Sequence, residues 1–142
     1  MTYQEAYAKA LRYLNVRFLS QEELRKKLRA GDVEESLIYE VIQGLTEERF
    51  LDDYRLAVGV YNYYVRKGQY GKKYIALRLK KRYLPIPEAD DVDYLDEEAV
   101  AEALVRRKFK GKGDARKIAH FLSYRGFDAW VIRNMMEQSS LL

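Results

Sequence analysis

The sequence lacks cysteine altogether and has a single histidine, His120, among its 142 residues. Without cysteine the chain can form neither a disulfide nor a thiolate metal site. His120 stands in a helical pattern between Ala119 and Phe121 and has no second histidine with which to bind zinc. We therefore expect no metal, no cofactor and a reducing compartment, the cytoplasm.

Helix-breaking residues and long apolar runs are also scarce. There are two prolines and eight glycines, and no stretch approaches about 18 uninterrupted apolar residues. Residues 1–5 carry neither the basic nor the apolar part of a signal peptide. With 48% apolar and 34% charged residues, the composition favours a well-ordered helical protein that is soluble inside the cell and binds no membrane.

One spaced pattern occurs three times: an apolar residue, Leu four positions later, a basic residue or Gly after three more, and an apolar residue beyond one spacer. The copies read Leu24, Leu28, Gly31 and Val33; Ile75, Leu79, Arg82 and Leu84; and Ile118, Leu122, Arg125 and Phe127. Four residues before each copy stands a residue suited to start a helix, namely Ser20, Gly71 and Asp114. The repeat predicts tandem helical modules, which bury a core by stacking and present one long surface rather than a catalytic cleft.

Apolar residues at helical spacing predict three helices in each of three modules. The expected modules are residues 1–50, 51–95 and 96–142. Pro85 and Pro87 restrict the backbone of the third helix of the second module, so we expect only one or two turns there. Because no segment alternates with period two, the predicted fold class is all-α, with essentially no sheet.

Charge is unevenly distributed, although the net charge is only +4. Residues 66–82 hold eight basic residues and no acid, residues 83–102 are strongly acidic, and residues 106–117 are basic again. Such blocks predict a bipolar surface that can meet a charged partner. Solvated helix faces that partly neutralise one another explain the same blocks equally well.

Motifs for catalysis are missing. Gly111-Lys112-Gly113 lacks the spacing of a phosphate-binding loop, which excludes nucleotide binding by this motif. The adjacent acids at 52–53 and 90–91 point about 100° apart on a helix and suit helix capping rather than Mg²⁺ binding. Ser20 and Ser123 have no base in any recognisable motif. We therefore expect a protein that is not an enzyme.

Tyrosine is frequent, and seven of the 13 tyrosines lie in residues 54–83, beside the first basic block. Exposed aromatic rings next to cations can stack on nucleic-acid bases. Tyr61 and Tyr64 more readily fill gaps between helices with their hydroxyls in water. Tyr70 and Tyr74, which flank two lysines, are the better candidates for exposure.

Several short motifs, in this order, resemble the RecX family of bacterial regulators of the RecA recombinase. They are Tyr13-Leu14, Arg17, Ser20, Glu23-Leu24, Leu28, Val41-Ile42, Leu45, Leu51-Asp52-Asp53, Gly71, Ile75, Leu79 and Arg125-Gly126-Phe127. The resemblance covers nearly the whole chain, and its order coincides with the internal repeat. Each motif alone is weakly specific, whereas the ordered set is fairly specific.

The resemblance implies three tandem three-helix bundles in a curved, elongated array. It also implies that the protein binds RecA and the RecA–DNA filament, lies along the filament groove, and suppresses filament growth, ATP hydrolysis and strand exchange. The chain departs from the family pattern at Pro85-Ile86-Pro87, where a regular helix is expected. It departs again at Arg82-Tyr83, where a turn containing Gly is more usual.

Charge alone selects the predicted contacts to an acidic filament surface or to phosphate. They are Lys72, Lys73, Arg78, Lys80, Lys81, Arg106, Arg107, Lys108, Lys112, Arg116 and Lys117. The same residues allow weak direct binding to DNA, and we expect a monomer. The alternative function is a stand-alone nucleic-acid-binding module with helix 71–82 or 114–125 as its recognition helix. A third is a purely structural helical adaptor.

Overall fold

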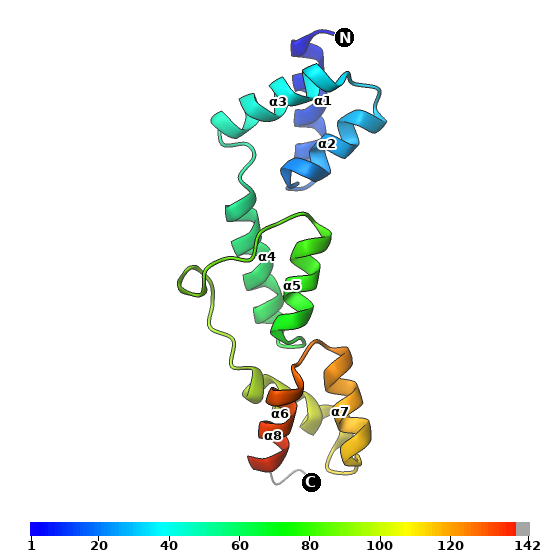
Figure 1. The fold of residues 1–142 in the computed structure, drawn as a ribbon, viewed down its shortest axis with the longest axis vertical. Coiled ribbons are helices and arrows are strands. Elements are labelled where there is room, and N and C mark those ends of the chain that lie inside the picture. Colours follow the sequence, from blue (N-terminus) through cyan, green and yellow to red (C-terminus); the bar gives the residue numbers. More distant parts are fainter. Residues whose placement is uncertain (139–142) are drawn as a thin grey trace. The chain divides into compact units, whose positions relative to one another are not determined.

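The computed structural model describes residues 1–138, and this part of the chain contains eight α-helices, one 3₁₀ helix and no strand (Figure 1). The prediction of an all-α protein is confirmed. The elements are α1 (Tyr3–Val16), α2 (Gln21–Ala30), α3 (Glu35–Glu47), α4 (Asp53–Lys67), α5 (Lys72–Lys81), η1 (Ala89–Asp91), α6 (Glu97–Phe109), α7 (Ala115–Tyr124) and α8 (Ala129–Gln138). None of the helices in residues 1–138 combines the length and apolarity needed to cross a membrane.

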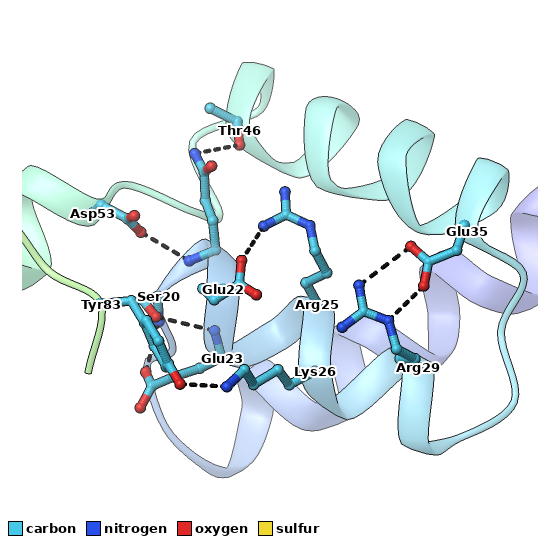
Figure 2. Close-up of polar contacts among 11 residues, drawn as sticks. Ser20, Glu22, Glu23, Arg25, Lys26, Arg29, Glu35, Thr46, Asp53 and Tyr83 are labelled. Atoms are coloured by element: carbon cyan, nitrogen blue, oxygen red, sulfur yellow. Dashed lines mark hydrogen bonds and ion pairs between the residues drawn. The ribbon is translucent and has the colours of Figure 1, made fainter. Parts of the chain in front are cut away.

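The helices begin where capping residues stand. Ser20 accepts a hydrogen bond from the backbone N–H of Glu23, and the Glu23 carboxylate accepts one from the backbone N–H of Ser20 (Figure 2). This reciprocal capping box satisfies two N–H groups that the helix itself leaves unpaired. Asp114 caps α7 with a single bond, accepting from the backbone N–H of Lys117. The predicted starts of the second helices of the first and third modules are thus confirmed.

The second helix of each repeat ends in the same hydrogen-bonded turn. The N–H groups of Val33, Leu84 and Phe127 donate to the carbonyl groups of Leu28, Leu79 and Leu122, five residues earlier. The spacer residue of each copy has positive φ: Asp32 at 63°, Tyr83 at 60° and Gly126 at 88°. These are Schellman ends, in which the last apolar residue folds back on the helix. The second copy keeps this turn with Tyr83, despite the absence of Gly.

The described chain divides into two compact units. Unit 1 comprises residues 1–59 and 79–86, and unit 2 comprises residues 60–78 and 87–142. The division passes through α4 and α5, so it does not follow the three predicted modules, whose boundaries remain a prediction. Between α5 and α6 the only helical element is η1, in agreement with the short third helix expected beside the two prolines.

Each unit has its own apolar core. In unit 1, α1, α2 and α3 contact one another around Leu24, Leu28, Val41 and Leu45, all of them fully buried. In unit 2, α6, α7 and α8 contact one another, and their core is a matching set of apolar side chains. These residues are Ala101, Leu104, Val105, Ile118, Leu122, Phe127, Val131, Ile132 and Met135. The leucines of the repeat are therefore core residues, as their spacing predicts.

In unit 2 the start of α5 lies against the end of α7 at two glycines. The N–H of Gly71 donates to the Arg125 carbonyl oxygen at 3.0 Å, and the N–H of Lys73 donates to the Gly126 carbonyl oxygen at 3.2 Å. A Cβ atom at Gly71 would lie 2.4 Å from the Gly126 oxygen, and one at Gly126 would lie 2.4 Å from the Tyr74 nitrogen. Only glycine lets the two backbones approach this closely.

In unit 1 the end of α5 is bonded to the start of α2 by Arg82. Its guanidinium donates to both oxygens of Glu23, at 2.9 and 3.0 Å, and to the Phe18 carbonyl oxygen at 2.8 Å. Arg17 also pairs with Glu23, at 3.0 Å. Burial raises the pKa of Glu23, but the hydrogen bonds from Arg82 and the Ser20 N–H outweigh it and hold the pKa below its ordinary value of 4.5.

We predict that Gly71→Ala destabilises the protein by about 1–3 kcal/mol, because the new methyl group forces two backbones apart. Gly59→Ala is the matched control, since a Cβ at Gly59 meets no atom within 4 Å. That change in α4 should stabilise the protein by about 0.5–1 kcal/mol. Urea unfolding followed by circular dichroism measures both effects, and equal stability of the two variants would contradict the close approach.

We predict that Glu23→Gln lowers the free energy of unfolding by about 1–2 kcal/mol at pH 7, because Arg82 loses its ionised partner. A carboxylate whose pKa is lowered by folding contributes stability above its unfolded pKa and loses it as the pH falls through the folded pKa. The difference in the free energy of unfolding between wild type and variant should therefore be largest at pH 7 and shrink below about pH 4.5. Unfolding curves at several pH values test this, and a difference that grows in acid would refute it.

Candidate basic and aromatic surface

Helix α5 carries three of the predicted contact residues in unit 2. The ammonium group of Lys73 lies 3.1 Å from a carboxylate oxygen of Asp128, and the backbone N–H of Lys72 donates to Glu97 at 3.0 Å. The ion pair with Lys73 lowers the pKa of Asp128. Arg78 donates from Nε to the Tyr64 hydroxyl at 3.1 Å. All three basic side chains are exposed.

The other two predicted residues of this helix, Lys80 and Lys81, are exposed as well but belong to unit 1. The basic block 66–82, continuous in the sequence, is therefore divided between the two units. Its members in unit 2 and those in unit 1 have to be tested separately as contact residues.

The second basic block lies wholly in unit 2. Arg106, Arg107 and Lys108 occupy the last turn of α6, where cations suit the negative end of the helix dipole. Arg106 pairs with Glu102 at 2.6 Å. Lys112 is in the loop that follows α6, and two further predicted contacts, Arg116 and Lys117, lie in the first turn of α7. All six side chains are exposed.

Three of these predicted residues line one open groove of about 760 Å³ in unit 2. They are Lys108, Arg116 and Lys117. The remaining lining residues are Phe109, His120, Phe121, Tyr124 and Arg125. Cations and rings in one groove can bind a polyanion through charge and a flat group through stacking.

Four tyrosines form a cluster between α4 and α5. The rings of Tyr70 and Tyr74 are stacked, with centroids 3.9 Å apart and planes 7° apart. Tyr64 meets both of them edge to face, and it also contacts Tyr63. The predicted exposure of Tyr70 and Tyr74 is wrong, because each buries one face against the other and both are half-buried. Tyr63 is the exposed member of the cluster.

Arg125 connects this cluster with the groove. Its guanidinium lies 4.9 Å from the centre of the Phe121 ring and 6.0 Å from that of Tyr70. Cations and rings of unit 2 thereby form one row of neighbouring contacts, which we call the cation–ring row. Its members, in order, are Lys108, Phe121, Arg125, Tyr70, Tyr74, Arg78, Tyr64, Tyr63 and Lys67.

The row joins the two basic blocks of the sequence through aromatic contacts. Burial, together with the hydrogen bond to Tyr70, raises the pKa of Tyr74, so its hydroxyl stays neutral at pH 7. The hydrogen bond to Tyr64 raises the pKa of Arg78. The row therefore combines basic side chains with aromatic rings. Among residues 1–138 no group of three or more acidic or histidine side chains could hold a metal ion.

Arg125 is the residue that the charge analysis missed. It lies outside both basic blocks, and the sequence marks it only as a member of the repeat and of the motif Arg125-Gly126-Phe127. The signal that could have found it is its equivalence with Arg82, since both stand just before the left-handed residue of a Schellman end. Each arginine reaches a carbonyl oxygen ahead of a helix, Arg82 that of Phe18 and Arg125 that of Gln69, the latter at 3.4 Å.

We predict that Arg125→Ala destabilises the protein by about 1–2 kcal/mol, because it removes two cation–ring contacts and one hydrogen bond. Lys112→Ala, a change of an exposed loop cation, should alter the unfolding free energy by less than about 0.5 kcal/mol. Chemical denaturation of both variants measures the difference. If Arg125→Ala lost no more unfolding free energy than Lys112→Ala, Arg125 would not be the residue that holds the row together.

Comparison with known proteins identifies relatives along most of the chain. Residues 6–45 match the first three-helix domain of RecX. The regulatory protein RecX of Pseudomonas fluorescens is 34% identical over 125 residues, which cover 80% of this chain and 78% of the relative. The regulatory protein RecX of Acinetobacter baylyi is 32% identical over 80% of this chain and 74% of the relative.

Solved structures agree with this similarity to RecX proteins at the level of the fold. The crystal structure of RecX from Lactobacillus salivarius superposes with a TM-score of 0.79, covers 99% of this chain and 97% of its own, and is 24% identical. A second RecX crystal structure gives a TM-score of 0.74 over 96% of this chain and 72% of its own, at 19% identity. With two relatives above 30% identity along most of its length, the chain belongs to the RecX family of regulatory proteins.

Proposed function

We propose that this protein regulates RecA, mainly as an inhibitor, by binding RecA and its nucleoprotein filament in the cytoplasm. On this proposal it suppresses filament growth, ATP hydrolysis and strand exchange without being an enzyme itself. The proposal is supported by membership in a family of regulatory proteins. It is also supported by the cation–ring row, an accessible positive surface of the kind that an acidic filament or phosphate backbone attracts.

The cation–ring row is the observation that carries the choice of contact surface. Lys108, Arg116 and Lys117 lie around one groove, and Lys108 belongs to the same row as Arg78, so a single partner can meet cations from both basic blocks. Lys72, Lys73, Arg106, Arg107 and Lys112 extend the positive surface of unit 2. Lys80 and Lys81 are exposed cations of unit 1. We propose a monomer of three tandem modules as the active form.

The first test is the ATPase rate of RecA from the same source on single-stranded DNA, titrated with this protein at near-physiological salt. The DNA is kept in excess of what the protein alone can sequester. We expect the rate to fall at less than one protein per RecA subunit, which favours end-capping or disassembly over competition for DNA. A rate unchanged throughout the titration would remove the inhibitory function.

We predict that reversing Lys108, Arg116 and Lys117 to Glu raises the concentration needed for inhibition roughly tenfold. Three lost charge contacts of about 0.5 kcal/mol each give a change of that size. Helicity should be unchanged, because the three side chains are exposed. The control reverses Lys26 and Lys27, exposed cations of α2 outside the predicted contacts. Equal inhibition by the groove variant and wild type would refute this contact surface.

The second candidate is a stand-alone nucleic-acid-binding module, which the cation–ring row of unit 2 favours. Rings beside cations stack on unpaired bases, and release of counterions from phosphates makes such binding salt-dependent. Tight binding of single-stranded DNA without RecA, weakening steeply between 50 and 200 mM salt, would support this function. The weak direct binding expected of a RecA regulator would leave the first proposal in place.

A further inference from the structure

Unit 1 exposes two phenylalanines that its core does not use. Phe18, in the loop between α1 and α2, is 77% exposed, and Phe50, in the loop between α3 and α4, is 53% exposed. Their backbones are fixed by hydrogen bonds. The Phe18 carbonyl oxygen accepts from Arg82 at 2.8 Å, and the Phe50 N–H donates to the Leu45 carbonyl oxygen at 2.9 Å. Two large apolar side chains are thus held in water on well-ordered turns.

The two rings line a common hollow of about 320 Å³. Leu19 and Leu56 contribute aliphatic walls, and Gly59 leaves one side open, since no atom lies within 4 Å of a Cβ placed there. Phe50 also lines a second, adjoining hollow, whose aliphatic walls come from Leu11 and Leu14 of α1. A continuous apolar surface of this kind marks a site of interaction when it is rimmed by polar groups.

The polar rim of this surface is positive. Arg12 lines one hollow, and Arg49 and Arg55 line the other. Within residues 1–138, none of these three guanidinium groups forms an ion pair with a carboxylate. The one acid that lines the hollows, Asp52, accepts a hydrogen bond from the backbone N–H of Arg55 at the start of α4. The rim therefore carries three positive charges against one negative charge, and none of the three arginines is ion-paired with that acid.

We propose that this surface of unit 1 docks an acidic segment of RecA that carries two or more apolar side chains. This inference rests on the proposed function, which supplies the partner. The apolar side chains would fill the two hollows and cover Phe18 and Phe50, while acidic groups beside them pair with the three arginines. Aromatic and arginine side chains together are the residues that most often contribute the binding energy of protein interfaces.

The apolar surface of unit 1 differs in chemistry from the cation–ring row of unit 2. This difference favours different binding partners for the two surfaces. Neither Phe18 nor Phe50 has a cation over its ring or a ring contact in the structure of residues 1–138. The aliphatic walls of the hollows come from leucine side chains, which offer no hydrogen bonds to the edges of bases, and the polar groups lie at the rim. They fit aliphatic side chains of a protein better than nucleotides.

The test measures binding of the full-length protein to RecA without DNA and, separately, to single-stranded DNA without RecA. The variant is Phe18→Ser with Phe50→Ser, and the matched control is Tyr39→Ser, which removes another exposed ring, 61% accessible, from α3 of the same unit. A second variant, Arg12→Glu with Arg55→Glu, leaves both rings in place. Circular dichroism verifies that all variants are folded.

We expect both surface variants to bind RecA roughly tenfold more weakly and DNA as wild type does, while Tyr39→Ser binds both normally. RecA binding by the two variants equal to that of wild type would overturn this inference and leave the proposed function standing. Failure of the wild-type protein to bind RecA would overturn both. Weaker DNA binding by the variants would assign the surface to nucleic acid, and loss of a wild-type self-association would assign it to a second copy; either outcome also overturns the inference.

Discussion

The way in which the second helix of each repeat ends is the constraint on which the structure depends. Leu28, Leu79 and Leu122 are buried, and each carbonyl oxygen accepts the N–H of an apolar residue five positions later. This bond requires a left-handed residue in between, which is Asp32, Tyr83 or Gly126. A left-handed tyrosine is strained by about 1–2 kcal/mol. The second repeat tolerates this strain because Leu84 is buried by the same turn.

The same helix ends make the contacts that extend each unit beyond its three-helix core. In unit 1, Arg82 at the end of α5 bonds to Glu23 and to the Phe18 carbonyl oxygen. In unit 2, the end of α7 receives hydrogen bonds from the start of α5 at two glycines that have no room for a side chain. A turn that terminates one helix thus also presents the groups that bond to the start of another.

Function follows from what these contacts leave exposed. In unit 2 the bonded helix ends bring Arg125 between Tyr70 and Phe121, and this places the tyrosine cluster next to the basic groove. In unit 1 the bond from Arg82 holds the loop of Phe18 in place beside Phe50. On the proposed function, the positive surface with rings would meet phosphate and the apolar surface with a positive rim would meet protein, the two components of a nucleoprotein filament.

The sequence by itself determined the helices, their starts at Ser20 and Asp114, and the buried stripe of the repeat, because capping and helical periodicity are local properties. It also identified the exposed cations, since charged side chains seldom lose contact with water. Only the tertiary structure decided that Tyr70 and Tyr74 stack on each other and that Arg125 joins two basic blocks. It alone divided block 66–82 between two units and brought Phe18 next to Phe50. These features depend on contacts between residues that lie far apart along the chain or on neighbouring helices, and no local pattern encodes such distances.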